Sequence, residues 1–136
     1  MLEKIKRSEG FSLIELIVVI AIMIILVSML VPNVVGYLDK ANKAVAKDAA
    51  QKIYTAALNY IYSEVGKGHE FEPNSEIDVE VLWSSDEQLL KEFGDYETVE
   101  IRVDSTGRII NYVYYKDNVG NEAVYPTYLE DKVLNK

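Results

Sequence analysis

Two apolar patterns follow one another along the N-terminal half of the chain. Residues 11–35 are apolar at nearly every position, and at about 37 Å as a helix they are long enough to cross a bilayer. In residues 36–65 apolar side chains recur at steps of three and four, which is typical of an amphipathic helix with a narrow, Ala-rich face. Together they predict one helix over residues 11–65, ended by the glycines after it and kinked near residues 28–32 by Pro32.

The C-terminal half predicts a small sheet. Residues 69–85 predict a loop with a short strand at 77–82, and residues 86–93 predict a short helix capped by Ser84 or Ser85 and ended by Gly94. Residues 99–103 alternate between apolar and polar side chains, which predicts a strand. Turns at 104–107 and 117–121 then separate it from a returning strand at 109–115 and a third strand at 122–125. The expected fold class is therefore α+β, a long kinked helix packed on an antiparallel β-meander.

Charge is distributed unevenly. The net charge is −8, and residues 64–136 carry seventeen acidic residues against seven basic ones. Because nucleic-acid binding requires a basic patch, this balance argues against it. Four lysines, however, follow the apolar run: Lys40, Lys43, Lys47 and Lys52. They predict a basic face on the helix, either solvated or directed at acids of an adjacent subunit. The chain has no cysteine, so a disulfide framework is excluded.

Glu15 is a carboxylate near the start of the apolar run. An ionisable group within a membrane span costs about 2.5–3.5 kcal/mol at the centre of a helix, and such groups usually have a function and a partner. The apolar run contains no cation. We therefore expect the partner of Glu15 to come from another molecule.

The ten residues ahead of the run contain Lys4, Lys6 and Arg7, and a basic flank of this kind stays in the cytoplasm. No pair of small residues suited to signal peptidase follows the run, whereas Gly10 lies directly before Phe11. Cleavage after Gly10 would remove the basic leader and keep the apolar segment. It would also create an ammonium group on Phe11, about one helical turn from Glu15.

This arrangement resembles the type IV pilin family, including the related pseudopilins. The residues that carry the resemblance are the Lys6-Arg7 pair, Gly10, the Phe11 to Glu15 stretch and Pro32, with the apolar run between them. Ser8 and Glu9 depart from the usual pattern because they separate the basic pair from Gly10, and the apolar run lacks the helix-loosening Gly that the family often has.

The resemblance implies a processing route. A prepilin peptidase/N-methyltransferase would cut after Gly10 and methylate Phe11, and Glu15 would pair with the Phe11 amine of a neighbouring subunit. The expected parts are a cleaved leader (1–10), a transmembrane and filament-core half-helix (11–35), and a globular domain (36–136) that includes the amphipathic half-helix. The precursor would be a single-pass protein of the cytoplasmic membrane with its N-terminus inside.

The function implied is that of a structural subunit which polymerises with itself, through a pilus assembly platform, into a cell-surface filament. Adhesion and motility are roles of such filaments. One alternative is a pseudopilin of a type II secretion or DNA-uptake apparatus. Another is a monomeric, membrane-anchored binding protein, which would need neither cleavage at Gly10 nor Glu15.

The sequence offers little for catalysis or cofactor binding. The single histidine, His69, lies in a loop, and no phosphate-binding loop or nucleophile motif is present, so we expect no enzyme activity and no cofactor. One loop leaves two readings open. Asp117, Asn118, Asn121 and Glu122 surround Gly120 and could bind calcium, or they could form a plain turn, since Asp, Asn and Gly are typical of tight turns.

Overall fold

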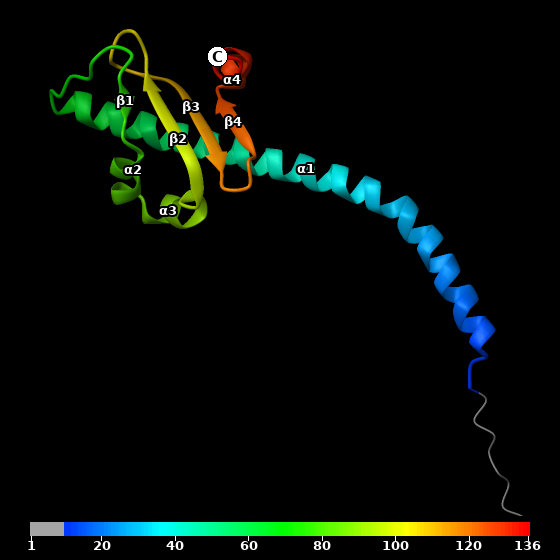
Figure 1. Cartoon of the computed structure of the whole chain (residues 1–136). Coiled ribbons are helices and arrows are strands. Elements are labelled where there is room, and N and C mark those ends of the chain that lie inside the picture. Colours follow the sequence, from blue (N-terminus) through cyan, green and yellow to red (C-terminus); the bar gives the residue numbers. More distant parts are fainter. Residues whose placement is uncertain (1–9) are drawn as a thin grey trace, which may run out of the picture. The chain divides into compact units, whose positions relative to one another are not determined.

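The computed structural model describes residues 10–136, so residues 1–9 of the predicted leader lie outside it. A single helix, α1 (Leu13–Gly66), makes up the N-terminal half, close to the predicted range of 11–65 (Figure 1). It begins two residues later than predicted, because Phe11 and Ser12 are not helical. It ends where the glycines were expected to end it, and Gly68 follows with a φ of +89°.

The helix remains α-helical through Pro32, and a kink at that position stays a prediction. The chain divides into two compact units, Met1–Asp39 and Lys40–Lys136. Every residue from 10 to 45 is exposed. The first buried side chain of α1 is that of Ala46.

The second unit contains a four-stranded antiparallel sheet in the order β1-β2-β3-β4. Its strands are β1 (Glu76–Ile77), β2 (Tyr96–Val103), β3 (Ile110–Asp117) and β4 (Glu122–Tyr125). The predicted meander is confirmed, and β2 and β3 are longer than the alternation of the sequence indicated. Figure 1 shows the sheet lying along the C-terminal half of α1.

The core lies between this sheet and one face of α1. That face is buried at six positions, four of them alanines: Ala46, Ala49, Ala50, Ile53, Ala57 and Ile61. The sheet contributes branched side chains from its inner face, including those of Ile101, Val103 and Val113, which are 0% exposed. The predicted Ala-rich face is therefore the packing surface, and its small side chains let the sheet come close to the helix backbone.

Two short helices connect α1 to β2, and here part of the prediction was wrong. Residues 77–82 do not form a strand, because β1 ends at Ile77 and α2 (Val79–Ser85) follows it. The Asp78 carboxylate caps α2 by accepting from the Glu80 N–H at 3.0 Å. The buried side chains of α2, Val79, Leu82 and Trp83, have helical spacing.

The next helix, α3 (Glu87–Phe93), was predicted, but its cap was not. Neither Ser84 nor Ser85 caps it, since both lie in α2. The Asp86 carboxylate accepts from the N–H groups of Gln88 and Leu89 at 3.1 and 3.0 Å. Gly94 ends the helix as predicted.

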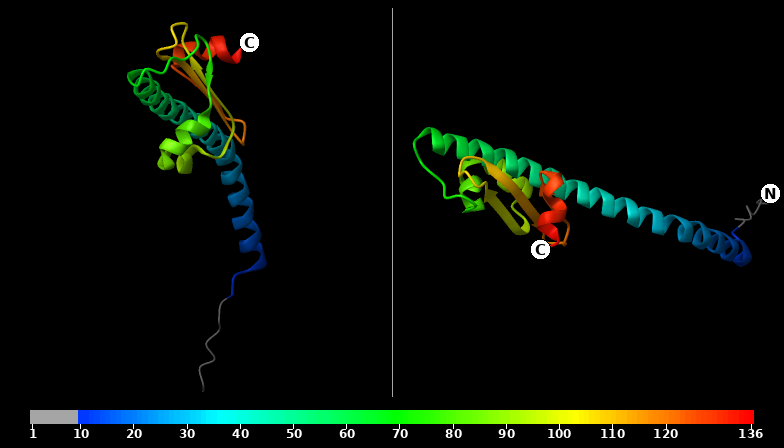
Figure 2. Two further views of the ribbon diagram at one scale, coloured as in Figure 1. Left: turned by 90° about the vertical axis from the view of Figure 1, so that its left-hand side faces the viewer. Right: turned by 90° about the horizontal axis from the view of Figure 1, so that it is seen from above.

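The C-terminal residues form a 3-10 turn, η1 (Thr127–Leu129), and a last helix, α4 (Glu130–Leu134), neither of which the sequence pattern predicted. α4 lies beside β4 (Figure 2). Ala123 and Val124 are successive residues of β4 and both are buried, although successive strand side chains point to opposite faces. The C-terminal segment therefore covers the second face of β4.

Candidate assembly site at the start of the long helix

Two hydrogen bonds that involve Ser12 close the first turn of α1. The Ser12 N–H donates to Glu15 Oε2 at 2.8 Å, and the Ile14 N–H donates to Ser12 Oγ at 3.3 Å. Ser12 is thus the N-cap residue, and Glu15 stands three residues after it. This is a variant of the capping box, in which the Ser12 side chain accepts from the second helical residue, Ile14, in place of Glu15, and it satisfies backbone N–H groups that a helix start otherwise leaves without partners.

Glu15 therefore has a partner in its own chain that our reading of the sequence missed. The signal was present, because Ser-x-x-Glu before an apolar run is the sequence pattern of a capping box. The partner is a neutral N–H group and not a cation. The position also suits a negative charge, since the N-terminus of a helix carries a partial positive charge.

The residues predicted to be processed lie directly before this capping box. Gly10 is exposed and non-helical, and a side chain built at that position would meet no atom of the described chain within 4 Å. The Phe11 side chain is 92% exposed. The structure thus places Gly10, Phe11 and Glu15 together on an accessible end of the helix.

The helix that follows presents apolar side chains on every side. The described residues contain one helix long and apolar enough to cross a membrane, and none of its apolar window is buried within the chain. Two polar side chains inside this stretch bond to the helix itself: Ser28 Oγ donates to the Ile25 carbonyl at 2.7 Å and Asn33 Nδ2 to the Met29 carbonyl at 3.3 Å. Among residues 10–136 nothing packs on this apolar surface, and exposed apolar surface of this extent is typical of a contact with lipid or with other protein.

The four lysines of the predicted basic face of α1 fall into two groups, one paired and one not paired within residues 10–136. Lys52 Nζ lies 3.0 Å from Asp48 Oδ2 and 2.7 Å from Glu92 Oε1, and it sits 5.2 Å above the centre of the Phe93 ring. Lys52 therefore links α1 to α3 within one subunit. No ion pair of Lys40, Lys43 or Lys47 occurs among residues 10–136.

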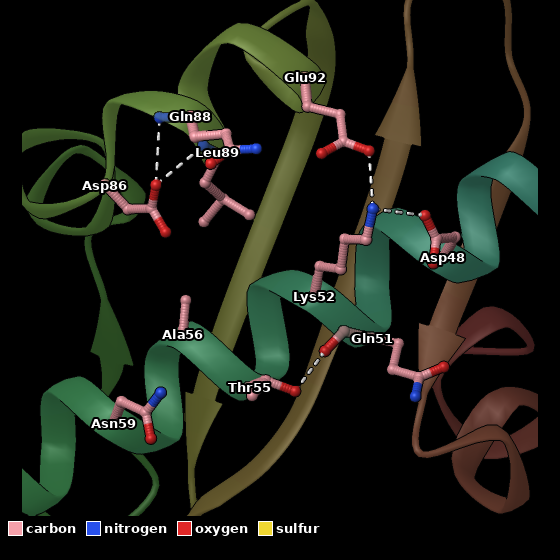
Figure 3. A pocket seen from close by; sticks show the side chains of 10 residues that line it. All are labelled: Asp48, Gln51, Lys52, Thr55, Ala56, Asn59, Asp86, Gln88, Leu89 and Glu92. Atoms are coloured by element: carbon pink, nitrogen blue, oxygen red, sulfur yellow. Dashed lines mark hydrogen bonds and ion pairs between the residues drawn. The ribbon is translucent and has the colours of Figure 1, made fainter.

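An open polar hollow surrounds Lys52 (Figure 3). It lies between α1 and α3, and its lining includes Gln51, Thr55 and Asn59 from α1 and Gln88 from α3. Thr55 Oγ1 donates back to the Gln51 carbonyl at 3.0 Å. The hollow is wide and solvated, and its charged groups are already paired across it, which fits a helix junction better than a ligand site.

A second charged cluster lies on the outer face of the sheet. Glu100 Oε1 accepts from the Tyr112 hydroxyl at 2.6 Å and from Arg102 Nε at 3.1 Å. Burial alone raises the pKa of Glu100, but the hydrogen bonds from Tyr112 and Arg102 outweigh it and hold the pKa below its ordinary value. Arg102 Nη1 also donates to the Asn74 carbonyl at 3.3 Å, so the cluster fastens the loop before β1 to the sheet.

The loop predicted as a turn or a calcium site is a tight β3–β4 connection. Asp117 Oδ1 accepts from the N–H groups of Val119 and Asn121 at 2.9 and 2.8 Å, and Oδ2 accepts from Asn121 Nδ2 at 2.8 Å. Asn118 donates to Asp95, and Glu122 accepts from the Tyr114 hydroxyl at 2.8 Å. Asp117 and Asn121 are thus bonded to each other, whereas Asn118 and Glu122 are bonded to residues outside the set, and calcium binding stays a prediction.

No cluster of three or more His, Cys, Asp or Glu side chains suited to a metal ion occurs in residues 10–136. His69 is exposed, and its Nδ1 contacts the Glu64 carboxylate at the end of α1. Its place in a solvated loop agrees with the sequence analysis.

Comparison with known proteins supports the reading of the N-terminus. A family model described as the prokaryotic N-terminal methylation motif matches residues 5–31. The type IV major pilin protein PilA of Myxococcus xanthus (strain DK1622) is 34% identical over 65 residues, which is 48% of this chain and 29% of that protein. The match thus spans less than a third of the relative's length. No solved structure matches the chain.

Proposed function

We propose that this type IV pilin-like chain is a structural subunit that polymerises with itself into a helical filament on the cell surface. The observation that supports this most is the first half of α1, an apolar helix that packs against no other part of residues 10–136 and begins near an accessible carboxylate. Lipid can cover this surface before assembly, and the same half-helix of other copies can cover it afterwards. The matches to the methylation motif and to a major pilin support the same role.

Processing would prepare the helix for assembly. A prepilin peptidase/N-methyltransferase would cleave after Gly10 and methylate the new N-terminus of Phe11. The precursor would span the cytoplasmic membrane once with its leader inside, and an assembly platform would transfer it to the filament. Methylation keeps the positive charge of the amine, so Phe11 would offer Glu15 of a neighbouring copy a cationic partner that the capping box lacks.

The pairing would also set the axial register of the subunits, because only one stagger brings the two groups together. Association inside lipid cannot depend on the hydrophobic effect, so it depends on close packing and on polar contacts of this kind.

The test is electron microscopy of filaments sheared from cells that carry the assembly machinery, together with mass spectrometry of the subunit. We expect filaments built of this chain, each subunit beginning at an N-methylated Phe11. Surface protein that keeps Met1 and forms no filament would contradict the proposal and favour a monomeric membrane-anchored protein.

The same N-terminal features also support a pseudopilin of a type II secretion or DNA-uptake apparatus. Deleting the gene separates the two roles. A pilin is required for sheared surface filaments, whereas loss of secretion or DNA uptake in cells that keep their filaments would identify a pseudopilin.

A further inference from the structure

Three lysines form a continuous basic stripe on α1. Lys40, Lys43 and Lys47 are spaced by three and four residues, which places them on one side of the helix, and all three are exposed. Lys52 lies five residues beyond Lys47 and so points about 140° away around the axis. We call Lys40, Lys43 and Lys47 the basic stripe. Among residues 10–136 it has no anionic partner.

The opposite kind of surface lies at one end of the sheet. The turn between β3 and β4 carries Val119 at its tip, and this side chain is 85% exposed. Asp95 and Glu122 flank the turn: Asp95 accepts from Asn118, and Glu122 accepts from Tyr114. Both carboxylates are exposed, and neither forms an ion pair among residues 10–136. Glu122 lies opposite Lys116 in the β3–β4 register, but the Lys116 ammonium is paired with Glu97. We call Asp95, Val119 and Glu122 the hairpin tip.

We propose that the hairpin tip of one copy docks on the basic stripe of a second copy. The inference rests on the proposed function, because it requires copies to lie side by side. The two surfaces are opposite in charge, and neither forms an ion pair among residues 10–136. The long stems of the lysines offer apolar surface that Val119 can cover, while the ammonium groups reach the flanking carboxylates.

A second copy is a better occupant than anionic lipid, because lipid bound to the basic stripe would leave the hairpin tip, with its exposed Val119 and carboxylates, without a partner. Exposed ion pairs are individually weak, but every subunit of a filament would repeat this contact. The pairing would thus fix how the outer domains meet, while the apolar half-helices hold the filament core.

Proximity can be tested by cross-linking, because the chain contains no cysteine that would interfere. The variant Lys43→Cys/Val119→Cys is assembled into filaments and treated with a short bifunctional thiol reagent. We expect a ladder of covalent oligomers after denaturation. The matched control, Lys43→Cys/Glu80→Cys, moves the second thiol to the exposed surface of α2 and should stay monomeric.

Charge is tested separately by reversal and exchange. Lys43→Glu/Lys47→Glu should lower the yield of sheared filaments several-fold at equal subunit levels in the membrane. Adding Asp95→Lys/Glu122→Lys to it should restore assembly. The control Lys91→Glu/Lys132→Glu changes the net charge equally on α3 and α4 and should assemble normally.

The outcomes separate this inference from the proposed function. A wild-type chain that forms no filament overturns both. Wild-type filaments with no ladder, or reversal variants that assemble as well as the control, overturn the docking inference and leave the filament role intact. A reduced yield that the exchange variant restores, together with the ladder, supports the docking.

Discussion

At the scale of single residues, the proposed assembly requires Glu15 to serve two arrangements. In the isolated subunit its carboxylate accepts from the Ser12 N–H and closes the first turn of α1. A neutral donor satisfies one oxygen but leaves the negative charge uncompensated, and an unpaired charge among apolar helices is strongly disfavoured. A neighbouring Phe11 ammonium would compensate it, so capping and assembly make different demands on the same side chain.

Substitutions at this turn separate the two demands. Glu15→Ala should leave processing, insertion and the folded outer domain intact and abolish assembly. Glu15→Gln keeps the capping box, which accepts Gln as well as Glu, but removes the charge, so it should also be impaired. Ser12→Ala is the control, because it weakens the cap by about 0.5–2 kcal/mol and retains the carboxylate. Yields of sheared filament at equal subunit levels measure the effects, and normal filaments from Glu15→Ala would disprove this role.

A second prediction at this scale concerns processing. Gly10→Leu should accumulate a full-length precursor in the membrane, because the peptidase requires a small residue at the cut. A side chain at this position meets no atom of the described chain within 4 Å, so the effect should not arise from misfolding. The mass of the purified subunit decides the matter. A mature chain beginning at Phe11 would contradict the prediction.

At the scale of elements, α1 is joined to the rest of its domain by a buried face and by exposed ion pairs, which differ in their contributions. Ile53→Ala should destabilise the domain by about 2–5 kcal/mol, because it removes a fully buried side chain from the core. Its neighbour Lys52 is exposed, and Lys52→Ala should destabilise the domain far less, because exposed ion pairs contribute little to stability. Trp83 is the single tryptophan and is buried, so its fluorescence can be used to follow unfolding in both variants.

The cluster on the outer sheet face predicts a pH dependence. The lowered pKa of Glu100 means that its contribution to stability is complete above the ordinary Glu pKa and is lost as pH falls through the folded-state value. Glu100→Gln should therefore be less stable than the wild type near pH 7, by about 1 kcal/mol. The difference should shrink below about pH 4. Chemical unfolding followed at several pH values tests this, and a difference that does not change with pH would contradict it.

At the scale of the whole molecule, we expect the two units to have different surroundings: lipid or other apolar helices for the first unit, and water for the second. The described part of the first unit, residues 10–39, buries no side chain, whereas the sheet, α2 and α3 bury the Ala-rich face of α1 in the second. Removing residues 1–35 should therefore leave a soluble, monomeric, acidic domain that unfolds cooperatively. Size-exclusion chromatography and thermal unfolding at neutral pH and moderate salt are the measurements. Aggregation, or a transition without cooperativity, would count against a boundary at residue 36.

The apolar pattern around residues 77–82 is compatible both with a strand and with a helix. Ile77, Val79 and Val81 alternate as in a strand, whereas Val79, Leu82 and Trp83 have helical spacing. The helix forms because Asp78 caps it and because Leu82 and Trp83 find space in the core, while Val81 is left 37% exposed. No property of these six residues alone could decide which set would be buried.

What the sequence determined by itself is local. The continuous apolar run, the three-and-four spacing after it and the terminating glycines predict α1, and Ser-x-x-Glu encodes its first turn, because these features depend on neighbours within one or two helical turns. Tertiary structure decided which polar groups meet. Lys52 reaches Glu92 across forty residues, and Arg102 fastens Asn74 across twenty-eight. Such pairings depend on how the sheet and α3 pack on α1, because the chain must fold before these side chains come within a few ångströms of each other.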